Sequence, residues 1–164
     1  VWSLERQMKL FLRVIPSWFG AAMVALACAT QANAAGVADK ILVVDPYVRA
    51  VPPVVKTTAA FMQFKNSNST EQFLVEASTP AAGGVELHMH TLDGDVMRMR
   101  RVPHIHLPPN EEIALAPGAE HIMLFDVSVA LQPGDQSPIT LTFGDGSTKQ
   151  ISAEVRKVES RMRH

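Results

Sequence analysis

The sequence predicts an all-β sandwich, and three observations lead to it. From Ile41 onward the chain divides into short β-forming segments, and none of them has a helical period. Turn-forming residues separate the segments at short intervals. No helix is expected that would connect parallel strands. We therefore expect about eight or nine short antiparallel strands, packed face to face with Greek-key connections.

Each expected strand ends at a recognisable breaker. The segments are 41–50, 57–66, 71–78, 85–92, 96–102, 111–118, 121–128, 138–146 and 149–158. The main turn sequences lie at 66–69, 93–94, 108–110, 117–118, 133–135 and 144–146. Alternation is clearest near the end, where Ile139, Leu141 and Phe143 would face one way and the intervening threonines the other.

The first 34 residues are typical of a signal peptide. Lys9 and Arg13 precede an apolar run at 18–29, and Ala32-Asn33-Ala34 is a small-residue cleavage pattern. Met8 is the expected true start, which makes 1–7 an overextension. Cleavage after Ala34 would leave one β-sandwich domain at 35–158 and a flexible tail at 159–164.

Export is therefore expected, with the periplasm as the location. The one cysteine, Cys28, lies inside the predicted signal, so the mature chain would carry neither thiol nor disulfide. A lipoprotein attached at Cys28 is the alternative, and we favour it less because the cleavage pattern downstream is better formed. No stretch of the mature chain approaches the roughly 20 apolar residues of a membrane-spanning helix.

Composition limits the partners. A length of 164 residues suits one domain, and the formal net charge is −1. The dispersed charges form no basic stripe that would follow a phosphate backbone, so nucleic acid is not an expected partner.

Histidine and methionine concentrate in one region of the chain. The cluster comprises His88, Met89, His90, Met97, Met99, His104, His106, His121 and Met123. Asp93-Gly94 predicts a two-residue hairpin loop, which would place His88 opposite Met99 and His90 opposite Met97. Facing Cβ atoms in such a hairpin are about 5 Å apart.

A third strand would complete the cluster. His121 and Met123 are two residues apart, so both project from one side of that strand. Two imidazoles and two thioethers could then converge on one point. Because thioether sulfur is soft and uncharged, it favours copper(I) over zinc, magnesium or calcium. We therefore expect one copper(I) per chain, bound as metal cargo.

The spacing of four of these residues resembles the signature of the PCuAC copper chaperones. It runs His88, ten residues, Met99, twenty-one residues, His121, one residue, Met123. The similarity extends over 41–155. It includes Val48-Arg49, Ala59-Ala60-Phe61, the segment 95–100, Leu115-Ala116-Pro117-Gly118 and Gly144-Asp145-Gly146. Tyr47 departs from the family, since a tryptophan is expected there, and this affects packing rather than the metal.

The resemblance implies a cupredoxin-like β-sandwich with His88, Met99, His121 and Met123 as copper ligands. It also implies delivery of periplasmic copper(I) to the copper-A centre of cytochrome c oxidase, alongside Sco-type thiol proteins. Two alternatives stay open: a copper-sequestering buffer, and an interaction domain that binds no metal. The sequence contains no catalytic motif, so an enzyme is not expected, and blue-copper electron transfer would need a thiolate.

Several other residues of the cluster have simpler explanations. His90 and Met97 are expected to be neighbours of the site, with alternative ligation left open. His104 and His106 fit an exposed strand edge better than a second copper site. Met162 and His164 fit a solvated tail.

Overall fold

Residues 36–94 and 96–157 are described by the structure, which is a computed structural model. They belong to one unit, 33–164. The predicted signal peptide (1–34) and the predicted tail (159–164) lie outside the described residues. Within the described part of the chain, no helix is long and apolar enough to cross a membrane.

In the described part of the chain, ten strands follow one short 3-10 helix. The elements are η1 (Val37–Lys40), β1 (Ile41–Arg49), β2 (Thr57–Asn66), β3 (Gln72–Ser78), β4 (Ala82–Asp93), β5 (Val96–Arg101), β6 (Ile105–Leu107), β7 (Glu112–Leu115), β8 (His121–Val127), β9 (Gln136–Phe143) and β10 (Thr148–Arg156). The expected all-β class is confirmed. The expectation of eight or nine strands missed β6, which has only three residues.

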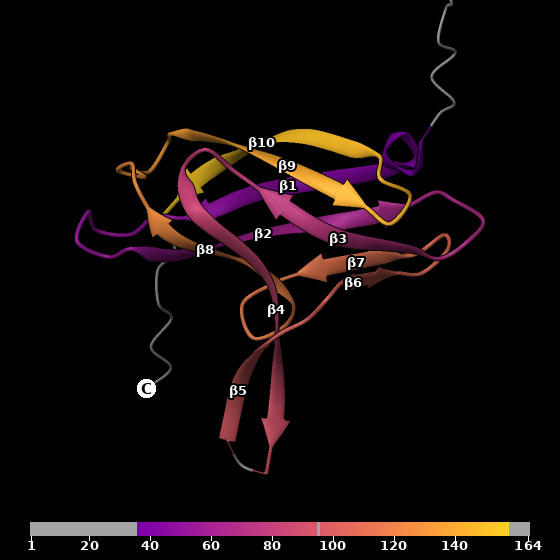
Figure 1. Ribbon diagram of the computed structural model, residues 1–164, viewed down its shortest axis with the longest axis horizontal. Coiled ribbons are helices and arrows are strands. Elements are labelled where there is room, and N and C mark those ends of the chain that lie inside the picture. The colour runs from indigo at the N-terminus through magenta and orange to yellow at the C-terminus, as the bar shows by residue number, and fades with distance from the viewer. Residues whose placement is uncertain (1–35, 95, 158–164) are drawn as a thin grey trace, which may run out of the picture. The chain divides into compact units, whose positions relative to one another are not determined.

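The strands form a continuous sheet that folds over on itself. Its order is β5-β4-β8-β2-β1-β10-β9-β3-β6, and β7 pairs with β2 off this path. Figure 1 shows the layer of β10, β9 and β1 above β8 and β7. The pairing of β1 with β10 is parallel, so the expectation of a purely antiparallel arrangement is wrong at this point. The strands at the two ends of the chain meet there, through a contact that no hairpin could make.

The folded sheet encloses one apolar core. Alternate residues of the strands supply it, as the period of two requires, and Ile139, Leu141 and Phe143 of β9 are all buried. In β8, Ile122 and Leu124 face this core. Their neighbours His121 and Met123 therefore project from the opposite face of the same strand. The site lies on that outer face.

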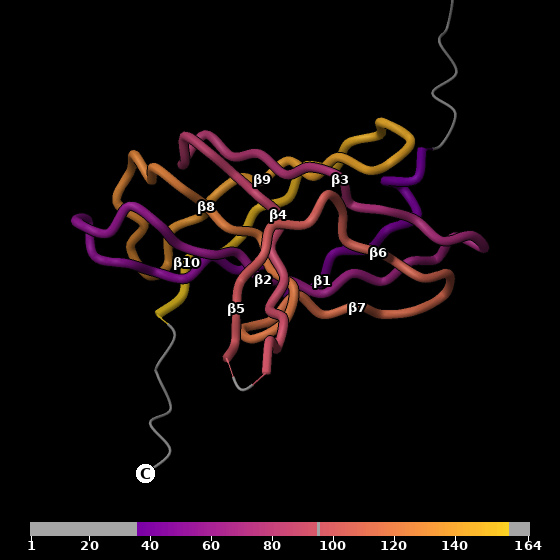
Figure 2. Tube along the Cα trace, turned by 60° about the horizontal axis from the view of Figure 1, so that its bottom comes forward, coloured from indigo at the N-terminus to yellow at the C-terminus, as the bar shows by residue number. Residues whose placement is uncertain are grey.

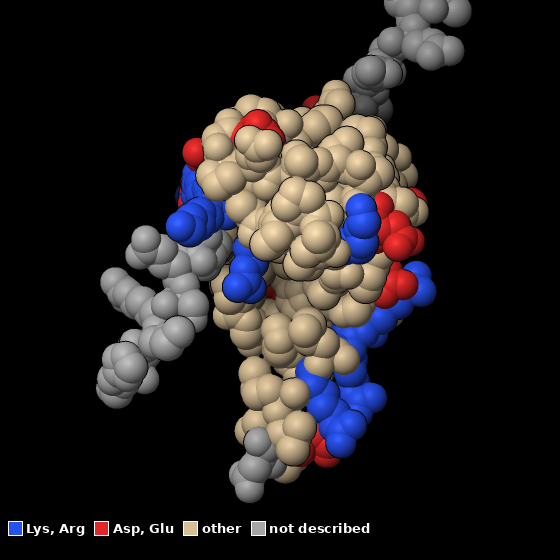
Figure 3. Space-filling model, turned by 90° about the vertical axis from the view of Figure 1, so that its left-hand side faces the viewer, with Lys and Arg blue, Asp and Glu red and all other residues tan. Residues whose placement is uncertain are grey.

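Strands β4 and β5 form a hairpin that projects from the body of the fold (Figure 1, Figure 2). All six residues of β5 are exposed. Met97 and Leu92 pair on one face, whereas Arg98 and Arg100 lie on the other, beside Asp93. Figure 3 shows the basic side chains gathered along one side of the projection.

The hairpin register differs from the expected one by two residues. Asp93 pairs with Val96, so His90 lies opposite Met99 and His88 lies opposite Arg101. The turn begins one residue later than expected because Gly94 adopts a φ of 63°. A primed hairpin turn needs a positive φ at its first central position, and glycine adopts that φ without strain. The expected Asp93-Gly94 loop would have placed aspartate at this position instead.

Candidate metal centre

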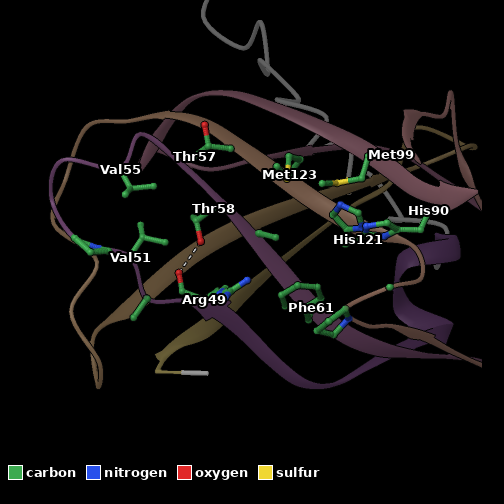
Figure 4. Close-up of a pocket in the computed structure, with 15 residues that line it drawn as sticks. Arg49, Val51, Val55, Thr57, Thr58, Phe61, His90, Met99, His121 and Met123 are labelled. Carbon is green, nitrogen blue, oxygen red and sulfur yellow. Dashed lines mark hydrogen bonds between the residues drawn. The ribbon is translucent and has the colours of Figure 1, made fainter. Parts of the chain in front are cut away.

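An open cleft of about 580 Å³ lies on the outer face of the sheet formed by β5, β4, β8 and β2. The β1–β2 connection and the turn before β8 form its walls. Two imidazoles and two thioethers line it, from His90, Met99, His121 and Met123. Figure 4 shows Met99 directed toward the rings of His90 and His121.

Strand β8 supplies the buried side of the cleft. His121 is only 2% exposed. Its Nδ1 lies 3.0 Å from the carbonyl oxygen of Ala119. Burial of the imidazole lowers the pKa of His121, and the positive charges of His90 and His88, when present, lower it further. The neutral form that a metal ligand requires is therefore favoured.

Aromatic rings pack beside His121. The ring of Phe61 lies 6.2 Å from that of His121, and Tyr47 lies 5.2 Å from Phe61. The guanidinium carbon of Arg156 lies over the ring of Tyr47, 5.2 Å from its centroid. Tyr47 itself does not line the cleft and reaches it through Phe61, which does.

The hairpin supplies the exposed side of the cleft. His90 and Met99 are direct partners across β4 and β5, so they share one face. The ring of His90 lies 5.0 Å from that of His121. Met99 is 53% exposed, so its thioether is accessible from solvent.

His88 has a different environment. It pairs with His121 across β4 and β8, and the two rings are 6.0 Å apart. However, its Nε2 lies 2.8 Å from Oε2 of Glu86, and its side chain is absent from the cleft lining. The same hydrogen bond lowers the pKa of Glu86. The guanidinium of Arg101 lies 3.5 Å from the other carboxylate oxygen.

The cleft therefore brings together Met99, His121 and Met123, three of the four residues expected as ligands. The fourth, His88, lies beside them with its Nε2 turned to Glu86. His90 stands where His88 was expected, opposite Met99. Sequence reasoning left His90 outside the ligand set because the assumed turn put it opposite Met97.

His104 and His106 lie at another place, on either side of Phe73. Their rings are 4.9 and 5.3 Å from the phenyl ring. His106 Nε2 also contacts Glu71 at 2.9 Å. Among residues 36–94 and 96–157, no group of three or more His, Cys, Asp or Glu side chains is placed to hold a metal ion. Met162 and His164 lie outside the described residues.

The donor set of the cleft combines neutral imidazole nitrogen with neutral thioether sulfur. Soft donors of this kind suit copper(I) and offer little to hard cations such as magnesium or calcium. The side chains come from three strands of a folded sheet, so the cleft exists only in the native fold.

Comparison with solved structures defines the class of protein. The copper-bound PCuAC domain from PmoF2 is 25% identical, with a TM-score of 0.63 over 73% of this chain and 94% of that one. The copper(I) form of DR1885 from Deinococcus radiodurans is 33% identical, with a TM-score of 0.60 over 71% of this chain and 77% of that one. The fold is therefore the cupredoxin-like fold of PCuAC domains, as the sequence resemblance implied.

The particular family follows from the sequence comparisons. Residues 41–155 match the family described as putative lipoprotein LpqE-like, and the chain belongs to it. A putative lipoprotein of Leifsonia xyli, Lxx21020, is 32% identical over 120 residues, covering 73% of this chain and 71% of that protein. Such relatives are consistent with export and leave lipid attachment open.

Proposed function

We propose that this chain binds one copper(I) ion in the cleft and carries it, without catalysing a reaction. The observation that carries the proposal is the meeting of Met99, Met123 and His121 from three strands in one open cleft. Copper bound to the PmoF2 domain and copper(I) bound to DR1885 support the choice of metal. Thioethers also suit an oxidising compartment, where thiols form disulfides.

The proposed ligand set is the one expected from the sequence: His88, Met99, His121 and Met123. His88 would join it through Nδ1, which is buried with no hydrogen-bond partner among the described residues, while its Nε2 stays 2.8 Å from Oε2 of Glu86. The two thioethers are the anchor of the site. They need no deprotonation, so they bind copper(I) at any accessible pH.

Exposure of the ligands favours a carrier. Met99 is about half exposed, and Met97 and Leu92 extend the same open face along the projecting hairpin. An acceptor could therefore approach the ion directly. We propose a periplasmic chaperone that delivers copper to the copper-A subunit of cytochrome c oxidase, with a Sco-type thiol protein as a second transfer partner.

The two alternatives make different demands on the site. An interaction domain that binds no metal would use its methionines for packing, yet Met97 and Met99 lie mostly in solvent. A sequestering buffer would use the same ligands as a carrier, so only transfer to an acceptor separates these two roles.

The binding proposal is tested by anaerobic competition for copper(I) against a chromophoric chelator, with mass spectrometry to count bound ions. Replacing Met99 and Met123 together with Ile should abolish tight binding, because isoleucine has similar volume but no sulfur. Met89→Ile is the matched control, since Met89 pairs with Arg100 on the other face of the hairpin. Parent-like binding by the double variant would disprove the site.

The carrier proposal is tested by mixing the copper(I)-loaded protein anaerobically with an apo copper-A domain. Copper should appear in the acceptor, as followed by mass spectrometry of both proteins. Retention of all the copper, together with normal oxidase assembly in a deletion strain on low-copper medium, would instead identify a buffer.

A further inference from the structure

We propose that Glu86 is a positioning residue of the copper site: it fixes the ring orientation and the tautomer of His88, so that Nδ1 of this ring is free to bind the ion. The inference rests on the proposed copper function and adds a residue to the site without changing its ligand set. Glu86 acts through His88 and is not itself a ligand.

The strand register is the first argument. Glu86 and His88 are two residues apart on β4, so they share the outer face of the sheet, whereas Leu87 between them is buried in the core. Across the pairing with β8, Glu86 lies opposite Met123 and His88 lies opposite His121. The backbones of two paired strands therefore hold the carboxylate beside the proposed ligands.

Packing leaves the orientation of the His88 ring undetermined. The centroid of this ring lies 6.0 Å from that of His121 and 5.9 Å from that of Phe125, and the side chain is only 14% exposed. These contacts restrict the plane of the ring. They do not distinguish two orientations related by a half-turn about the Cβ–Cγ bond, because an imidazole has nearly the same shape in both. A hydrogen-bond partner is needed to distinguish them.

Glu86 provides this partner. Its Oε2 lies 2.8 Å from Nε2 of His88. A carboxylate oxygen only accepts, so Nε2 carries the proton and, in the neutral ring, Nδ1 keeps its lone pair. This Nδ1 is buried and has no hydrogen-bond partner among the described residues. A buried nitrogen without a partner is costly, and a metal ion bound to Nδ1 would remove that cost while the carboxylate holds the other nitrogen.

Arg101 in turn restricts Glu86. Its guanidinium lies 3.5 Å from Oε1, the carboxylate oxygen that His88 does not contact. Arg101 is also the partner of His88 across β4 and β5. Its side chain is 72% exposed, so this ion pair contributes little by itself. The bond between Glu86 and His88 should therefore account for most of the effect on copper binding.

Competition for copper(I) with variants of the full mature protein tests this role. Glu86→Ala should weaken copper(I) binding by about tenfold or more, as the loss of such a partner typically does. Glu86→Gln should bind within about threefold of the parent, because the amide oxygen can still accept the proton of Nε2. Arg101→Ala should also stay within about threefold of the parent. Glu112→Ala, which removes an ion-paired glutamate on β7, is the matched control.

Glu86→Gln separates positioning from charge, since it removes the negative charge and keeps the acceptor. A loss of affinity in Glu86→Gln as large as that in Glu86→Ala would overturn the positioning role.

Nitrogen NMR of the copper-free protein gives a readout that is independent of affinity. In the parent, His88 should show a protonated Nε2 and an unprotonated Nδ1, and one equivalent of copper(I) should shift the Nδ1 resonance. In Glu86→Ala, the proton should be distributed over both nitrogens before copper is added. An unchanged tautomer in that variant would overturn the inference. Circular dichroism and melting temperature verify that each variant is folded.

Two further comparisons separate this inference from the function beneath it. In a His88→Ala background, Glu86→Ala should change the affinity by less than about twofold, and a larger loss would show that Glu86 does not act through His88. If Glu86→Ala binds copper(I) as the parent does while Met99→Ile/Met123→Ile does not, the inference fails and the copper function stands. If the methionine variant also binds copper(I) as the parent does, the proposed function itself fails.

Discussion

At the scale of single residues, the buried side chain of Asn66 provides hydrogen-bond partners for four backbone groups. It is 1% exposed at the end of β2. The two N–H groups of its side-chain amide are shared among the carbonyl oxygens of Thr70, Leu107 and Pro108, which lie 3.2, 2.9 and 3.0 Å from Nδ2. Its carbonyl oxygen accepts from the backbone and side chain of Asn68, both at 2.9 Å. One side chain thus joins the β2–β3 turn to the end of β6.

Asn66→Ala should lower the free energy of unfolding by about 3 kcal/mol. The substitution leaves several of these carbonyl groups without a donor, and each buried unsatisfied group costs about 1 to 3 kcal/mol. Urea denaturation measures the loss. Gln63→Ala, at an exposed position of the same strand, is the control and should change stability by less than about 0.5 kcal/mol. Equal effects of the two substitutions would contradict the proposed role of Asn66.

Asp145 allows a prediction about pH. Its carboxylate accepts from the hydroxyl and backbone of Ser147 at 2.6 and 2.9 Å, and from the backbone of Val37 at 2.9 Å. The bond with the Ser147 hydroxyl is the main cause that lowers the pKa of Asp145 in the folded protein. The ionised form is therefore favoured by folding, and its contribution is complete above the unfolded pKa, about 3.9.

That contribution should be lost as pH falls from about 4 through the lowered folded pKa of Asp145. Asp145→Asn should cost about 1 kcal/mol or less at pH 7, because the group is exposed to solvent. The gap between parent and variant should narrow below pH 4. Urea titrations at several pH values measure it, and a gap that widens in acid would show the opposite sign.

At the scale of elements, most strands could be predicted from the sequence, and their partners could not. Alternation and turn residues are local, so β1 to β5 and β7 to β10 were expected near their observed positions. Strand β6 has three residues, too few for a period to appear. The parallel pairing of β1 with β10 joins the two ends of the fold, and no local pattern encodes it.

The candidate site shows the same division. The sequence gives the types of donor atom. It also predicts that Met99, His121 and Met123 lie together, because alternation fixes which residues share a face of a strand. The identity of the histidine opposite Met99 depends on where the turn begins. Two hairpin registers that differ by two residues keep the same faces, so alternation could not distinguish them.

The projecting hairpin should respond most strongly to copper. Strand β5 is exposed along its whole length, so few tertiary contacts protect its backbone hydrogen bonds. Copper bound to Met99 would tie β5 to His121 and Met123 on β8. Hydrogen exchange of the β5 amides should therefore slow on addition of copper(I), by about tenfold or more. The amides of β9 serve as the internal control and should not change; a uniform change in both strands would contradict a local tie.

At the scale of the whole molecule, one face of the sheet provides the stabilising core and the other face provides the candidate site. One face closes over the apolar core, whereas the outer face of β8 and its neighbours holds the cleft. Exposed side chains of the cleft, such as Met99, can therefore change without leaving voids in the core. This division is expected to let binding variants fold normally, which makes them usable in the tests above.

Copper(I) should stabilise the entire fold, because its proposed ligands come from β5, β8 and β4 and meet only in the native state. A ligand at a free concentration about 100 times its dissociation constant adds about 2.7 kcal/mol to the free energy of unfolding. For a domain of this size, that corresponds to a rise of about 10 °C in melting temperature. Anaerobic calorimetry in a copper(I) buffer measures the rise. The Met99→Ile/Met123→Ile variant should melt at one temperature with or without copper(I), and an undiminished rise in that variant would place the stabilising ion outside the cleft.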